Sequence, residues 1–170
     1  MFFFCFLQLR KIYKQIFQRT SMMEKTLVLI KPDAMVKKLA GNIISDLYNL
    51  NLKMIGLKLV NVKRELAEQH YNEHKNKPFF KELIEHITGA LHNNENVIAI
   101  VYEGENAIQK IRDAVGKTNP DECEPHHLRG KYGKIHTKTN CHETVVHASD
   151  SKENAEKEIK LWFKDDELVD

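Results

Sequence analysis

Among the histidines of the chain, His147 lies where a short strand would meet the start of a helix. Residues 144–147 are rich in β-branched side chains, which favours a strand. Asp150 with Glu153 three residues later has the form of a capping box that opens a helix. A neutral imidazole is a competent nucleophile near pH 7 and can carry a group between two substrates. From position alone, an ordinary partly buried histidine without a catalytic role is the commoner case.

A lysine follows the first predicted strand of the chain. The aliphatic and β-branched run 26–30 ends in Lys31-Pro32-Asp33. Because proline has no N–H to donate to a central sheet ladder, the strand must end before Pro32. The sequence therefore predicts a loop that displays Lys31.

Hydrophobic spacing predicts the remaining strands and helices. Strands are predicted over 53–62 and 97–102, and the second is a continuous aliphatic run, typical of a strand buried on both faces. In the first of these strands, alternation places Ile55, Leu57 and Leu59 on one face and Lys58 on the opposite, wetter face. Helices are predicted over 43–50, 65–74, 78–88, 107–115 and onward from Asp150, the last with Ala155, Ile159 and Trp162 on one face.

Residues 117–142 have no clear period and are rich in Asn, Pro, His and Thr. They predict a long loop, and long ordered loops in compact domains are usually functional. The complete order, β-α-β-α-α-β-α-loop-β-α, is close to a split βαβ pattern. We therefore expect an α+β fold, a ferredoxin-like βαββαβ antiparallel sheet covered by helices, with an added long loop near the active site.

Composition narrows the class of protein. A chain of 170 residues is long enough for one well-buried domain, and a formal net charge of +2 argues against a general nucleic-acid binder. The three cysteines, Cys5, Cys123 and Cys141, form neither a paired framework nor a metal-binding spacing, so we expect free thiols in a reducing compartment.

The first 23 residues differ from the rest, with an apolar start, several basic residues and no acidic residue before Glu24. The apolar run is too short to span a bilayer, and no secretory cleavage pattern follows it. We expect residues 24–170 to form the domain and residues 1–23 to be a non-essential extension. A mitochondrial presequence, or a start at Met22 or Met23, is the alternative.

Short motifs from Glu24 to the last residue resemble, in the same order, those of the nucleoside diphosphate kinase family. The run 144–151 is similar to the family's N-x-x-H-[GA]-S-D motif, in which the histidine becomes phosphorylated. So many matches in one chain are more specific than a lone motif. The other matching runs are Lys31-Pro32-Asp33, His70-Tyr71, Lys77-Pro78-Phe79-Phe80, Tyr102-Glu103-Gly104, Gly116-Lys117-Thr118-Asn119-Pro120, Leu128-Arg129-Gly130 and Leu161-Trp162-Phe163.

The resemblance implies ping-pong transfer of the terminal phosphate from a nucleoside triphosphate, mainly ATP, to a nucleoside diphosphate through a phosphohistidine on His147. It implies that Glu158 hydrogen-bonds the imidazole, that Ser149 assists, and that Mg²⁺ arrives with the nucleotide phosphates, so that no protein metal site is needed. It also implies a homo-oligomer, either a hexamer or a tetramer built from dimers. We expect a cytoplasmic location and no specific nucleic-acid or membrane partner. The residues implied to bind the nucleotide are Lys31, Tyr71, Arg112, Thr118 and Arg129 at the phosphates, Phe79 and Leu83 at the base, and Thr144 at the sugar.

The residues alone leave other interpretations open. Phe79 would more often be a core residue, Arg112 a solvated helix charge and Glu158 an exposed carboxylate. The chain also departs from the family pattern. Thr144 stands where an asparagine is usual, and His126 and His127 stand where glycine and threonine are usual. Residues 91–95 are an insertion, and the segment 131–143 is longer than in the common form.

Two rival functions follow from these departures and from the element order. One is a family member without turnover that binds nucleotides or a partner protein. The other is an RNA-binding domain, which shares the βαββαβ order and stacks bases on strand aromatics. The predicted strands here lack interleaved aromatics, which disfavours RNA binding.

Overall fold

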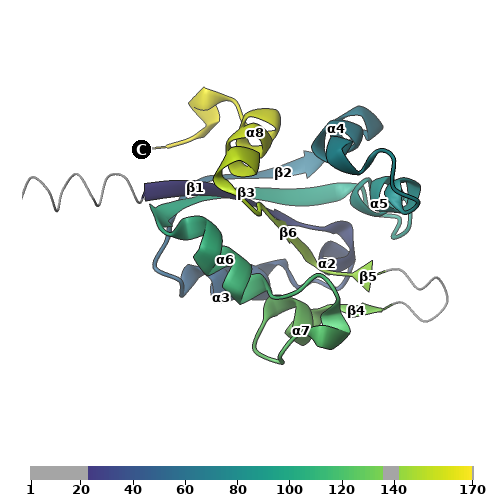
Figure 1. Cartoon of the computed structure of the whole chain (residues 1–170), viewed down its shortest axis with the longest axis horizontal. Helices are drawn as coiled ribbons and strands as arrows, with labels where there is room; N and C mark the ends of the chain where they lie inside the picture. Colours follow the sequence, from purple (N-terminus) through teal and green to yellow (C-terminus); the bar gives the residue numbers. More distant parts are fainter. Residues whose placement is uncertain (1–22, 136–141, 170) are drawn as a thin grey trace, which may run out of the picture.

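The computed structural model describes residues 23–135 and 142–169, and its centre is a four-stranded antiparallel sheet (Figure 1). The strands are β1 (Met23–Ile30), β2 (Lys53–Asn61), β3 (Asn96–Glu105) and β6 (Val146–Ala148), in the spatial order β2-β3-β1-β6. This arrangement confirms the predicted α+β, ferredoxin-like sheet. The aliphatic run predicted to be buried on both faces lies in β3, between β1 and β2.

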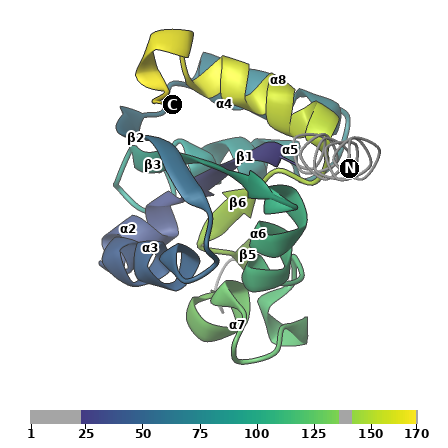
Figure 2. The same ribbon diagram turned by 90° about the vertical axis from the view of Figure 1, so that its left-hand side faces the viewer.

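Helices cover both faces of the sheet (Figure 2). On one face lie α4 (Arg64–His70), α5 (Phe80–Ile87) and α8 (Lys152–Trp162), and on the other lie α2 (Pro32–Val36), α3 (Ala40–Tyr48) and α6 (Ala107–Val115). Alternate β1 residues divide between the layers: Leu27 and Leu29 pack under α8, and Val28 and Ile30 pack over α3 and α6. Three short 3₁₀ helices, η1 (Asn72–His74), η2 (Pro120–Glu122) and η3 (Asp165–Glu167), complete the connections.

The predicted faces of strand β2 are wrong. A bulge between Met54 and Gly56 shifts the register against β3, so the side chains beyond it reverse their faces. Leu57 and Leu59 are 51% and 61% exposed. Lys58 instead lies under the C-terminal segment, with its ammonium 4.7 Å from the Phe163 ring centroid. The apolar side of this edge strand therefore faces outward.

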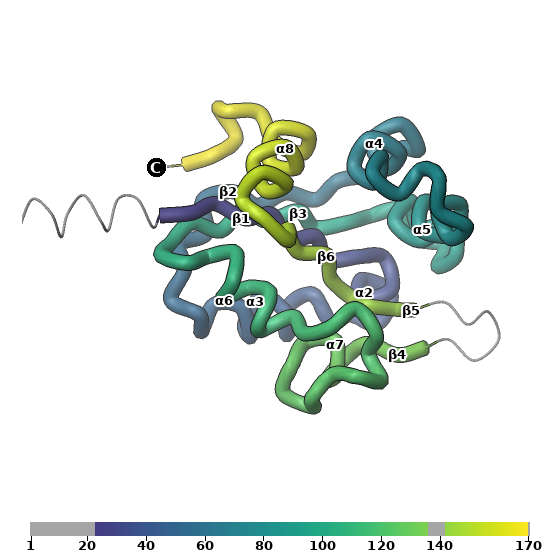
Figure 3. Tube along the Cα trace, in the orientation of Figure 1, coloured from purple at the N-terminus to yellow at the C-terminus, as the bar shows by residue number. Residues whose placement is uncertain are grey.

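The predicted long loop over 117–142 contains short elements of regular structure in the residues described there. The tube in Figure 3 leaves α6, turns through η2 into α7 (Leu128–Tyr132), and continues into β4 (Lys134–Ile135), which pairs with β5 (His142–Glu143). Leu128 is 2% exposed and joins the α3/α6 core. Tyr132 packs against the same core and donates through its hydroxyl to Asp46 on α3 (2.9 Å), so contacts at both ends hold this short helix in place. In the described ranges 23–135 and 142–169, no helix has the length and apolar character to cross a membrane.

Candidate active site

The backbone that leads into His147 is held in an unusual conformation. Val145 has φ = 55°, a left-handed conformation that is strained for a β-branched residue. Its N–H donates to Asp33 Oδ2 (2.9 Å), and its carbonyl accepts from the Lys31 N–H (2.9 Å). These two bonds fix the turn, and pairing of His147 with Leu29 fixes the short strand that follows.

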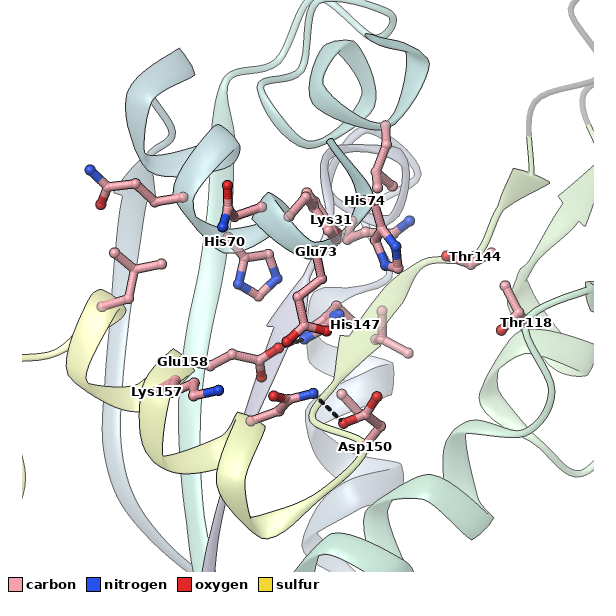
Figure 4. Close-up of a pocket in the computed structure, with 18 of the residues that line it drawn as sticks. Lys31, His70, Glu73, His74, Thr118, Thr144, His147, Asp150, Lys157 and Glu158 are labelled. Carbon is pink, nitrogen blue, oxygen red and sulfur yellow. Dashed lines mark hydrogen bonds and ion pairs between the residues drawn. The ribbon is translucent and has the colours of Figure 1, made fainter. Parts of the chain in front are cut away.

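A carboxylate orients the His147 imidazole. Glu158 Oε1 lies 3.0 Å from His147 Nε2, and Glu158 Oε2 accepts from the Ser149 hydroxyl at 2.5 Å. Ser149 is in turn fixed by the Leu27 N–H, which donates to its Oγ (3.2 Å). Because the carboxylate can only accept at this position, Nε2 carries the proton and Nδ1 keeps its lone pair. In Figure 4, Glu158 reaches from α8 toward His147.

His70 packs beside the same imidazole and is held as a neutral donor. Its ring centroid lies 4.5 Å from that of His147, nearly perpendicular to it. Trp162 Nε1 donates to His70 Nδ1 (3.2 Å), which leaves the His70 proton on Nε2. Burial, and then the neighbouring His147, hold the pKa of His70 well below its usual value.

His70, His147 and Glu158 are close enough together to bracket a metal ion. Two observations argue against that use. Coordination through His70 Nε2 would require the proton to move to Nδ1, where Trp162 already donates. Mg²⁺ also prefers oxygen ligands to imidazoles.

Positive charge and hydroxyl donors surround His147. Lys31 lies in the connection between β1 and α2, as predicted, but it is only 4% exposed, so the expectation that this loop displays it is wrong. Arg129 donates through Nη1 to the Gly116 carbonyl (3.0 Å) and through Nη2 to the Val146 carbonyl (3.2 Å). Burial lowers its pKa, but a guanidinium stays charged in proteins. Burial, and then Glu158, raise the pKa of the Tyr71 phenol, so Tyr71 is a neutral donor.

These residues line one cavity of about 700 Å³, a volume typical of small-molecule sites. Figure 4 shows Thr118 and Thr144 on the side of the cavity opposite α8. Of the residues that the resemblance implies for catalysis and nucleotide binding, only Ser149 is absent from the cavity wall, because it is fully buried behind Glu158. The others that line the cavity are Lys31, Tyr71, Phe79, Leu83, Arg112, Thr118, Arg129, Thr144, His147 and Glu158.

Two of the alternative expectations for single residues are wrong. Phe79 is 51% exposed at the N-terminus of α5 and lines the cavity, so it is not a core residue. The side chain of Glu158 is only 15% exposed, so it is not a solvated carboxylate. Arg112 is exposed as expected, yet it also faces the cavity.

The start of α8 differs by one residue from the predicted capping box. Ser151, not Asp150, is the N-cap residue, and its Oγ accepts from the Asn154 N–H (3.2 Å). Asp150 accepts from the Asn154 side chain instead (2.8 Å) and lines the cavity. The sequence offered no means to choose between two adjacent residues that can both cap a helix.

Several cavity residues were not singled out from the sequence. His74, Glu73, Asn154 and Lys157 project into the cavity from η1 and α8. His86 lies behind Lys31. Their exposed or helical settings carry no local signal of function, and only the fold brings them together.

The His147 imidazole has a fixed tautomer and a free nitrogen, and it faces cations across a cavity of the size of a nucleotide. This arrangement defines the class of phosphotransferases that work through histidine. The family model for nucleoside diphosphate kinase matches residues 24–168. The nucleoside diphosphate kinase of Pyrococcus abyssi is 48% identical over 147 residues, which cover 86% of this chain and 88% of that protein. The chain belongs to the nucleoside diphosphate kinase family and is a phosphotransferase.

Solved structures of the family have the same fold. The nucleoside diphosphate kinase from Borrelia burgdorferi, a transition state mimic with bound vanadate and ADP, matches with a TM-score of 0.80 at 29% identity, covering 88% of this chain and 92% of that one. The Halobacterium salinarum enzyme in complex with CDP matches with a TM-score of 0.77 at 38% identity, covering 86% and 91%.

Proposed function

We propose that His147 Nδ1 attacks the terminal phosphorus of a nucleoside triphosphate, mainly ATP, and that the resulting phosphohistidine is discharged by a nucleoside diphosphate. The Nδ1–P bond forms as the bond to the bridging oxygen breaks, and the diphosphate leaves with that electron pair. The single observation that carries the proposal is the Glu158–His147 contact of 3.0 Å. It leaves Nδ1 as the unprotonated nitrogen in a cavity lined by cations.

The surrounding residues have separate roles in this proposal. Lys31, Arg112 and Arg129 stabilise negative charge on the transferred phosphate, and the hydroxyls of Tyr71 and Thr118 donate to its oxygens. Glu158, supported by Ser149, stabilises the imidazole as positive charge develops on it. The residues assigned to catalysis are therefore His147, Glu158, Ser149, Lys31 and Tyr71.

The base and sugar would lie on the exposed side of the cavity. Phe79 presents its ring beside Leu83, and stacking on an aromatic face accepts every base. Thr144 is 6% exposed and offers one hydroxyl toward the sugar. This site fits an acceptor range of nucleoside diphosphates rather than one base.

Transfer between nucleotides calls for Mg²⁺, and we propose that the ion arrives with the nucleotide. The carboxylates that line the cavity are Glu73, Asp150 and Glu158, and Glu158 already binds His147 and Ser149. Glu73, and Asp150 through the oxygen that does not accept from Asn154, would contact the water shell of an ion held mainly by phosphate oxygens.

Incubation of the protein with Mg²⁺ and γ-labelled ATP alone is expected to leave a phosphate on the chain that is labile in acid and stable in base. A nucleoside diphosphate added afterwards should remove the label and yield the matching triphosphate. ATP binding without labelling of the wild-type protein would contradict the proposal and would support a nucleotide-binding module instead.

We also propose that the chain forms a homo-oligomer through β2, either a hexamer or a tetramer built from dimers. β2 is the outer strand of the sheet, and an unpaired strand edge with apolar side chains is a template for pairing. Leu57 and Leu59 are exposed on it, and the Val169 N–H bonds only its start, at the Ile55 carbonyl.

Replacing Leu59 with Lys is expected to shift the protein toward the monomer in sedimentation velocity at micromolar concentration, because it places a charge in the apolar contact. Leu91→Lys, on an exposed leucine of the 91–95 insertion, is the matched control. A monomeric wild-type protein would exclude the assembly.

We propose a cytoplasmic location, since Cys123 is a free thiol and cytosolic proteins keep thiols reduced. The alternative, a mitochondrial location, depends on residues 1–23, most of which lie outside the described residues. Cys5 and Cys141, also expected to be free thiols, lie outside them too.

A further inference from the structure

A buried imidazole lies behind Lys31, outside the reaction described so far. His86, on α5, is 3% exposed, and its Nδ1 is 3.2 Å from the Lys31 ammonium nitrogen. An ammonium has only donors, so His86 Nδ1 must accept and its proton must lie on Nε2. Burial, and then the charge of Lys31, lower the pKa of His86, which keeps the ring neutral and able to accept.

The other edge of the same ring faces Asp33. His86 Nε2 lies 3.7 Å from Asp33 Oδ1, and neither atom has a hydrogen-bond partner among the described residues. Asp33 Oδ2 holds the Val145 N–H, and the Lys31 backbone N–H holds the Val145 carbonyl. His86 therefore contacts the side chains of both residues that hold Val145 in its strained conformation, two positions before His147.

The insertion noted in the sequence supplies a second imidazole to this cluster. His92 packs edge-on against His86, with ring centroids 5.0 Å apart, and is itself partly buried. The segment that carries it is tied to α5, since the Leu91 and His92 N–H groups donate to the Glu85 and Gly89 carbonyls. The insertion thus places a second imidazole ring against His86.

We infer that His86 is a positioning residue for phosphoryl transfer, which fixes the Lys31 ammonium toward the transferred phosphate and braces Asp33 against the turn at Val145. The inference rests on the proposed role of Lys31. Lys31 and His86 both line a second cavity, of about 390 Å³, that lies beside Phe79 and Leu83. Without this acceptor, the Lys31 ammonium would lose one of the contacts that set its direction.

Three substitutions of His86 separate a positioning role from a structural one. His86→Leu fills the space without an acceptor. His86→Asn places an amide oxygen near the position of Nδ1, and His86→Gln places its polar group near the position of Nε2. The matched control is Ile87→Ala, which creates a cavity at the next residue of the same helix, in the core under α8.

We expect His86→Leu to slow single-turnover phosphorylation of His147 by ATP by about tenfold to a hundredfold, the range for a buried charged group that loses a partner. His86→Asn should recover most of this loss, and His86→Gln should recover less. The affinity for ADP, which lacks the transferred phosphate, should change less than threefold, roughly. Ile87→Ala should lower the unfolding midpoint without a comparable loss of rate.

The inference is overturned if His86→Leu and Ile87→Ala, at matched stability, phosphorylate His147 at similar rates, or if His86→Asn is as slow as His86→Leu. A separate measurement does not depend on activity. In ¹⁵N NMR of the wild-type protein, His86 should be the neutral tautomer with the proton on Nε2, and its Nδ1 resonance should move in Lys31→Met. A proton on Nδ1 would refute the contact and the inference with it. If the wild-type protein shows the expected Nδ1 resonance but takes up no phosphate from ATP, only the proposed function is refuted.

Discussion

The His147→Ala protein is expected to take up no phosphate from ATP and to lose turnover by a factor on the order of 10⁴ or more, as when an enzyme loses its nucleophile. His70, the imidazole packed beside it, cannot replace it in this proposal, because the lone pair of His70 at Nδ1 is directed to Trp162. Coupled-enzyme assay of the steady-state rate and acid-labile labelling would measure both quantities.

Two further variants help to interpret that result. His126→Ala removes an exposed imidazole outside the cavity and should behave as the wild-type protein. Glu158→Gln keeps an acceptor for His147 Nε2 but removes the negative charge, so we expect labelling to proceed at a reduced rate. Labelling of His147→Ala at the wild-type level would show that another residue carries the phosphate.

Replacing Arg129 with Lys is expected to reduce turnover about a hundredfold, the scale of losing one transition-state donor. The lysine keeps a positive charge but has no planar fork. It could not donate to the Gly116 and Val146 carbonyls and face the phosphate at the same time. The rate of His147 phosphorylation in a rapid-quench experiment would measure the loss.

Lys131→Gln is the matched control for Arg129→Lys. Lys131 lies two residues further along α7, and its ammonium pairs with Asp46 away from the cavity. The Lys131→Gln protein should therefore retain the wild-type rate. A fully active Arg129→Lys protein would mean that the guanidinium serves only to hold the backbone around it.

Much of the site could be predicted from the sequence, because its chemistry lies in short motifs. Lys31, Arg129 and His147 each occur in a short run, and the runs together resemble the nucleoside diphosphate kinase family closely enough to indicate phosphoryl transfer. The helix with Ala155, Ile159 and Trp162 on one face is confirmed, since all three are buried. Periodicity predicts such features well because each depends on residues close together in the chain.

The features that could not be predicted depend on contacts between distant residues. The bulge in β2 is defined by its pairing with β3, and it exchanged the faces of Leu57 and Lys58. Helix α7 has five residues and too little local pattern to be recognised, and it is anchored by the burial of Leu128. The His86 contact joins residues 55 positions apart, and no spacing rule relates them.

The left-handed conformation of Val145 adds an unfavourable free energy to the folded state. A residue in such a region costs about 1–3 kcal/mol, and here Asp33 and the Lys31 backbone hold the turn in that conformation. The contacts that orient the turn before His147 thus come from the protein's own residues, and so does the direction of the imidazole. Strain of this kind lowers the stability of a fold, and a nucleophile held in a fixed direction meets phosphorus with less loss of entropy.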